Sequence, residues 1–102
     1  MVVNCRRNGN VAIIALSGEL DHHSAAYVKN EMSRILLDPA VTDITLDLKN
    51  LRFMDSSGIG VIMGRYRELK KRNGRICAIN ISPQVDKLMS LSGLYKIVQK
   101  IG

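Results

Sequence analysis

The chain has 102 residues, 46% of them hydrophobic, which suffices for one packed domain spanning residues 1–102 but not for two. One Phe, three Tyr and no Trp predict an aliphatic core and leave few rings to stack on bases, which disfavours single-strand nucleic-acid readers such as OB-folds and RRMs. The net charge of +6 permits an acidic partner, and most of it lies in residues 65–75, where six basic residues accompany one acidic residue.

The first half of the chain predicts a hairpin, a helix and a strand. Asn8-Gly9 separates strand-like residues 1–7 and 11–16 and favours a type I′ turn, whose two central residues both need φ > 0. Apolar residues recur at helical spacing over residues 24–37. Residues 44–48 then alternate apolar and polar, which predicts a strand with one polar face and a sheet with one thinly covered side.

The second half predicts two more helices and two more strands. After an expected loop over residues 49–54, a second helix runs to about residue 72. The remaining expected elements are a strand over residues 75–80, a helix starting at Ser82-Pro83 and ending at Gly93, and a strand over residues 97–101. The order β-β-α-β-α-β-α-β predicts an α/β domain with a mixed, mostly parallel sheet, right-handed crossovers, three helices and an antiparallel N-terminal strand.

Two cysteines and one short apolar run indicate the cellular compartment of the protein. Cys5 and Cys77 lie in strand-like apolar surroundings, and a chain with a full core needs no disulfide, so we expect both to be reduced packing residues. The apolar run of residues 11–16 is far below the ~20 residues of a membrane span and too short for a signal-peptide core. The expected location is the cytoplasm, with no membrane partner.

The densest motif is residues 53–60, where a loop enters the second helix. Functional groups collect at such junctions of open α/β sheets, and a hydroxyl there is surrounded by unsatisfied helix N–H groups. The alternative is that Asp55, Ser56 and Ser57 only cap the helix. The segment lacks a dinucleotide fingerprint, the Lys of a P-loop and a nucleophile elbow, and the adjacent His22 and His23 do not have metal-ligand spacing on a helix. We therefore expect a binding protein, not an enzyme, with no cofactor and no metal.

Two features of the second helix have open alternatives. Gly60 and Gly64 lie one turn apart, which fits either the close approach of a partner or close packing of the helix on its own sheet. The basic residues after Arg65 form either a solvated face or a docking patch.

Residues 18–23, 53–60, 64–66 and 81–94 together resemble the STAS domain of sporulation-type anti-anti-sigma factors, over almost the whole chain. The resemblance implies that the unphosphorylated form binds an anti-sigma factor, an ATP- or ADP-bound serine kinase of the histidine-kinase-like ATPase fold, and so frees a sigma factor for transcription. It implies that this kinase phosphorylates the serine after the motif's aspartate, Ser56 here, and that a PP2C-type phosphatase restores it.

The resemblance also implies the surroundings of the switch. The phosphorylation-site environment would comprise Asp21, Asp55, Ser57 and Gly58. The expected partner-binding residues are Met54, Ile59 and Gly60. The family pattern does not require the strongly basic charge, but we expect Arg65 and Arg67, the basic residues of the second helix nearest the motif, to help dock an acidic partner surface. The family usually has a further C-terminal helix, whereas this sequence stops at Gly102, so either that helix is absent or the sequence is trimmed before it.

Two other functions stay open from the sequence. One is an acidic-surface or nucleic-acid binder that uses residues 65–75, although we expect no direct nucleic-acid partner. The other is a small-molecule or nucleotide sensor that binds its ligand near Asp21 and Ser56.

Overall fold

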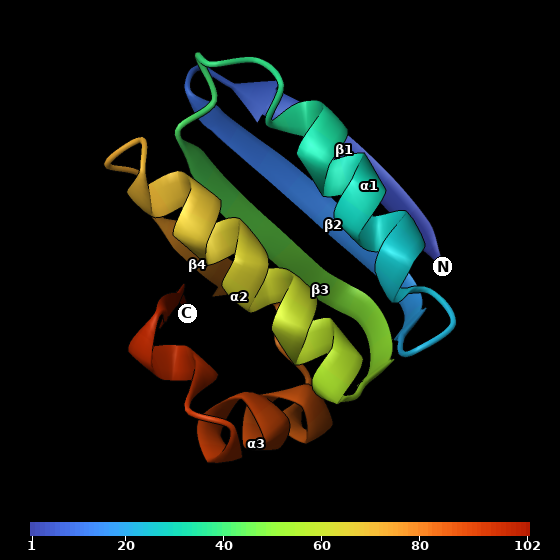
Figure 1. Cartoon of the computed structure of the whole chain (residues 1–102). Coiled ribbons are helices and arrows are strands. Elements are labelled where there is room, and N and C mark those ends of the chain that lie inside the picture. The colour runs from blue at the N-terminus through green and yellow to red at the C-terminus, as the bar shows by residue number, and fades with distance from the viewer.

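Five strands form one mixed sheet in the computed structural model, which describes residues 1–102 (Figure 1). The sheet order is β1-β2-β3-β4-β5; β1 is antiparallel to β2, and the other neighbouring strands are parallel. The elements are β1 (Val2–Asn8), β2 (Val11–Leu20), α1 (Ala25–Ile35), β3 (Asp43–Met54), α2 (Ser56–Lys70), β4 (Ile76–Ile79), α3 (Pro83–Leu91), the short 3₁₀ helix η1 (Leu94–Lys96) and β5 (Val98–Lys100). The predicted fold class and element order are confirmed.

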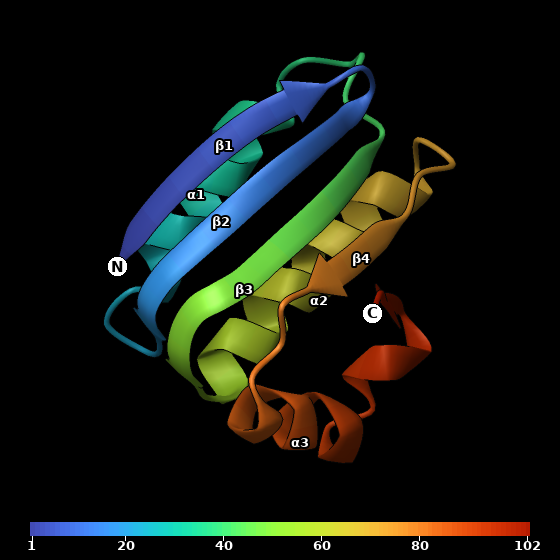
Figure 2. The ribbon, with the colours of Figure 1, turned by 180° about the vertical axis from the view of Figure 1, so that it is seen from behind.

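The helices cover the sheet unequally. Helices α1 and α2 lie side by side over one face, while α3 lies at the end of the sheet where α2 begins (Figure 1). The opposite face has no helix over it (Figure 2), as the polar face of the third strand predicted. On that bare face, Val11, Ile13 and Ala15 of β2 are only half-buried.

The core lies between the sheet and helices α1 and α2 and extends to α3 and η1, which contribute Val85, Met89 and Leu94. It contains 22 buried hydrophobic residues and no buried polar or charged residue. The strands supply it by alternation, since every second residue of β2 from Ala12 to Leu16 and of β3 from Ile44 to Leu48 is buried. The aliphatic core predicted from the composition is therefore present.

The opening hairpin is present, but its turn differs from the prediction. Asn8 pairs with Val11, so Gly9 and Asn10 form the two-residue loop. Only Gly9 of these two has a positive φ, of 62°. A type I′ turn centred on Asn8-Gly9 is therefore wrong, because such a turn needs positive φ at both central positions.

Strand β3 is longer than predicted. The expected loop over residues 49–54 is strand, because β3 keeps pairing with β2 up to the contact of Leu20 with Met54. Irregular pairing between Ala15 and Ser17 and between Gly18 and Glu19 shifts the register, which breaks the regular alternation along β3. Without this alternation, the spacing of apolar residues does not predict the second half of β3.

Both cysteines are free thiols, as predicted. Cys77 is half-buried, with its sulfur 3.2 Å from the Thr45 hydroxyl. Cys5 is exposed on β1, so the interpretation of this residue as a packing residue is wrong. None of the helices has the length and apolar character needed to cross a bilayer.

Candidate functional site

Asp55 links the end of β3 to the start of α2. Its backbone is extended, and its Oδ1 accepts the backbone N–H of Ser57 at 2.8 Å and that of Gly58 at 3.4 Å. Its own backbone N–H donates to the carbonyl oxygen of Leu20 at 3.2 Å. Asp55 therefore caps α2 and also ties it to the end of β2.

Ser56 is the first residue of α2 and is exposed. Its hydroxyl makes no hydrogen bond within the chain, because the side chain of Asp55 provides the cap. Ser57 is half-buried and contributes its backbone N–H to that cap. The interpretation that all three polar residues only cap the helix is thus wrong for Ser56, whose hydroxyl is left free for chemistry.

Gly58 is the position where α2 comes closest to the core. A Cβ at this residue would lie 2.6 Å from Cγ of Met54 and 2.8 Å from Cγ of Leu20. Both distances are far below van der Waals contact, so a larger residue here would force Met54 and Leu20 to shift. Gly58 acts by positioning the neighbouring serines.

Asp21 organises the loop between β2 and α1. Its Oδ1 accepts the backbone N–H groups of His23 at 2.9 Å and Ser24 at 3.2 Å, while the Ser24 hydroxyl donates to the carbonyl of Glu19 at 2.7 Å. Desolvation works to raise the pKa of Asp21, but the hydrogen bonds from Ser24 and His23 outweigh it and hold this pKa below its ordinary value. Asp21 follows Leu20, whose carbonyl binds Asp55, so this loop adjoins the start of α2.

The apolar residues proposed as partner contacts differ in exposure. Met54 is only 4% exposed and packs in the core, so its side chain is not available to a partner. Ile59 is half-buried against the core. Phe53 and Met63, which sequence reasoning did not propose as contacts, are 40% and 38% exposed. A strand prediction continued to Met54 would have found Phe53, because its neighbour Met54 faces inward.

Gly60 and Gly64 have open space beside them. No atom lies within 4 Å of a Cβ built on either residue, so the interpretation that these glycines permit close packing on the sheet is wrong. Both line a groove of about 350 Å³ between α1 and α2. The full lining is Lys29, Ser57, Gly60, Val61, Gly64, Arg65 and Arg67, and we call this set the inter-helix groove.

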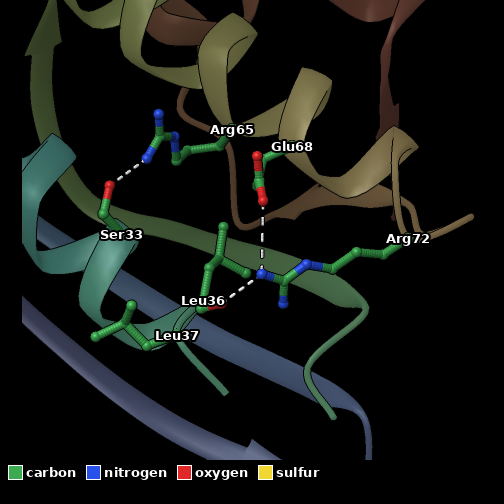
Figure 3. Close-up of a pocket in the computed structure, with 6 residues that line it drawn as sticks. All are labelled: Ser33, Leu36, Leu37, Arg65, Glu68 and Arg72. Atoms are coloured by element: carbon green, nitrogen blue, oxygen red, sulfur yellow. Dashed lines mark hydrogen bonds and ion pairs between the residues drawn. The ribbon is translucent and has the colours of Figure 1, made fainter. Parts of the chain in front are cut away.

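Arg72 shows that part of the basic stretch has a structural role. Its guanidinium donates to the carbonyl oxygen of Leu36 and lies 3.6 Å from Glu68 (Figure 3). It also donates to the carbonyl oxygens of Asp38 at 3.1 Å and of Val41 at 2.9 Å. These carbonyls belong to the end of α1 and the loop that follows it. Arg72 therefore fastens α2 to α1 and is not free for a partner.

The other basic residues of this stretch differ in the contacts they make. Arg65 reaches from α2 to the hydroxyl of Ser33 on α1 (Figure 3). The ammonium of Lys70 lies 5.8 Å from the ring centroid of Tyr66. Arg67 is exposed and has no ion-pair partner. Residues 65–75 thus do not form one uniform docking patch.

His22 and His23 are both exposed, with ring centroids 5.5 Å apart in an edge-to-face arrangement. No group of three or more His, Cys, Asp or Glu side chains is placed to hold a metal ion.

Comparison with known proteins identifies the family. The sequence model of the STAS domain matches residues 3–102. The chain belongs to the STAS domain family. This STAS domain is 41% identical over 96 residues to an anti-sigma F factor antagonist of Paenibacillus polymyxa, covering 94% of this chain and 82% of that protein. It is 43% identical over 82 residues to an anti-sigma F factor antagonist of Lysinibacillus sphaericus, covering 80% and 70%.

Solved structures agree with this assignment. The anti-sigma factor antagonist SpoIIAA in its unphosphorylated form matches with a TM-score of 0.73 and 35% identity, over 88% of this chain and 83% of that one. The Bacillus cell fate determinant SpoIIAA in its phosphorylated form matches with a TM-score of 0.76 and 34% identity, over 99% and 92%. These relatives are regulatory antagonists rather than enzymes, and the resemblance inferred from the motifs is confirmed.

Proposed function

We propose that this STAS domain is an anti-sigma factor antagonist whose switch is Ser56. In the unphosphorylated form it binds an anti-sigma factor that is also a serine kinase, and a sigma factor is released. The observation that carries the proposal is the exposed, unbonded hydroxyl of Ser56 at the start of α2. The names of the relatives, with SpoIIAA solved in both phosphorylation states, support it.

The position of Ser56 suits a switch that spares the fold. Transfer of the γ-phosphoryl group of ATP to its Oγ, with release of ADP and a proton, adds about −1.5 to −2 charges at pH 7. A helix N-terminus favours an anion through its partial positive charge, so α2 should tolerate the group. Asp55 precedes Ser56 in the chain, so two anionic groups would then adjoin at the start of α2.

The change in charge is large enough to end a complex. A thousandfold loss of affinity corresponds to about 4 kcal/mol, which a repelled or desolvated phosphate at an interface can supply. A PP2C-type phosphatase would remove the group and restore binding. The partners proposed for this protein are therefore the kinase and the phosphatase.

The experiment is phosphorylation by the cognate kinase with ATP, followed by mass spectrometry. We expect a single phosphate on the wild-type protein and none on Ser56→Ala. Ser57→Ala is the matched control, since it removes the neighbouring hydroxyl, and it should still take the phosphate. A phosphate retained in Ser56→Ala would refute the site.

A further inference from the structure

The inter-helix groove begins directly beside the proposed switch. Ser57, which follows Ser56, lies at one end, and Gly60 and Gly64 continue along the same side of α2. Lys29 of α1 lines the other side. Helices α1 and α2 lie next to each other over the sheet, so the groove opens on the helical face of the domain (Figure 1).

The two glycines of the groove have no internal reason to be glycine. Glycine is among the least favourable residues in a helix interior, and both lie inside the 15-residue helix α2. Gly58 and Gly74 are different, because a Cβ would lie 2.6 Å and 1.6 Å from the nearest atom. At Gly60 and Gly64 nothing lies within 4 Å, so a side chain would only fill the groove. Their small size would suit the close approach of an external chain.

The charge of the groove specifies the chemistry of that chain. Three basic residues line it, and no acidic residue does. Lys29 and Arg67 are exposed and have no ion-pair partner within the chain. Arg65 donates to the hydroxyl of Ser33 and adds its positive charge to the wall of the groove. A groove lined by three cations, two of them exposed and unpaired, is complementary to carboxylates.

We propose that the inter-helix groove receives an acidic segment of the anti-sigma factor. The segment's backbone passes over Gly60 and Gly64, and its carboxylates pair with Lys29 and Arg67. This inference rests on the proposed function and assigns the surface and the charge of the partner.

The location of the groove explains how the switch acts. A phosphate on Ser56 lies one residue from Ser57, which lines the groove. It brings a dianion to the place where an acidic segment enters, and like charges repel. Release therefore needs no rearrangement of the domain.

The test is isothermal titration of the purified protein with its cognate anti-sigma factor kinase loaded with ADP. The variant Gly60→Leu/Gly64→Leu should bind at least about tenfold more weakly, because its side chains fill the groove. The variant Lys29→Glu/Arg67→Glu should also lose about tenfold or more at low salt. The matched control Lys87→Glu changes an exposed lysine on α3 and should bind like the wild type.

A melting curve for each variant distinguishes a loss of affinity from a loss of stability. Both groove variants should melt no lower than the wild type, since their sites are exposed or open. Wild-type affinities in both groove variants would overturn the groove and leave the proposed function standing. No binding by the wild type would overturn both. Binding of a random DNA duplex at about 50 mM salt that is lost in Lys29→Glu/Arg67→Glu, with binding to the kinase intact, would instead make the groove a nucleic-acid surface.

Discussion

Asp55 accepts the backbone N–H of Ser57 at 2.8 Å, so the residue before Ser56 holds the residue after it. The hydroxyl between them is presented by a fixed piece of backbone without being used itself. Preorganisation of this kind favours recognition by a kinase, because little conformational freedom has to be lost on binding.

Removing the cap should weaken the domain. We expect Asp55→Ala to lower the free energy of unfolding by about 1 kcal/mol, since Ala cannot accept the N–H groups of the first turn. Asp55→Asn should retain most of the stability, because Asn is an equally good N-cap. Urea denaturation monitored by circular dichroism measures both variants. Equal losses in the two would mean that the carboxylate charge, and not the cap, is what matters.

Two glycines of one helix should respond in opposite directions. Gly58→Ala should destabilise by about 1–3 kcal/mol, because its methyl group overlaps Met54 and Leu20. Gly60→Ala should stabilise by up to about 1 kcal/mol, because it gains helix propensity in open space. The melting temperatures of Gly58→Ala and Gly60→Ala test both expectations, and each variant is the control for the other. A destabilised Gly60→Ala would contradict the open groove.

A negatively charged residue at position 56 should weaken binding without changing the fold. Ser56→Asp should keep the circular-dichroism spectrum of the wild type, since a carboxylate is favourable at a helix N-terminus. Its affinity for the anti-sigma factor should fall by about tenfold or more. Ser90→Asp places the same charge on exposed α3 and should bind normally. Unchanged binding of Ser56→Asp would exclude an electrostatic mechanism.

Arg72 should matter for stability although it lies in the basic stretch. Arg72→Ala should lower the free energy of unfolding by about 1–3 kcal/mol, because three carbonyl oxygens around the end of α1 lose their donor. Arg72→Lys should recover part of it, since an ammonium cannot match the planar fork. Arg67→Ala, at an exposed position, should change stability by less than about 0.5 kcal/mol. Chemical denaturation of the three variants is the measurement.

The last strand should give the domain an acid-sensitive contact. The Tyr95 hydroxyl and the Lys100 ammonium, 2.9 Å away, donate to Asp86 and hold the pKa of this carboxyl below its ordinary value. A carboxyl with a lowered folded-state pKa adds stability above its unfolded pKa of about 3.9, and this stability is lost as the pH falls through the folded value. Melting temperatures should therefore fall less between about pH 5 and pH 2 in Asp86→Asn than in the wild type. Parallel curves would rule this contact out.

Elements with strong local signals were predictable from the sequence. Ser82 followed by Pro83 marked the start of α3, and the structure has Ser82 accepting the N–H of Val85. The same holds for Asp55 before α2. Local rules work here because caps depend on atoms only two or three residues apart.

Features that depend on distant contacts were not predictable. The second half of β3 follows from pairing with β2 through two irregularities, which the spacing of apolar residues cannot reveal. Arg72 has a structural role because it donates to carbonyl oxygens more than thirty residues away in the chain. Similarly, only coordinates show that Met54 is enclosed while Gly60 is open.

The domain has two different surfaces, the bare face of the sheet and the helical layer on the other side (Figures 1 and 2). Asn4 of β1 pairs with Ala15 and shares that face, while Ser56 and the inter-helix groove belong to the helical layer (Figures 1 and 2). A reporter group placed at position 4 would therefore lie on the face opposite Ser56 and the inter-helix groove. The helical layer, which contains the proposed phosphorylation site Ser56, stays unmodified.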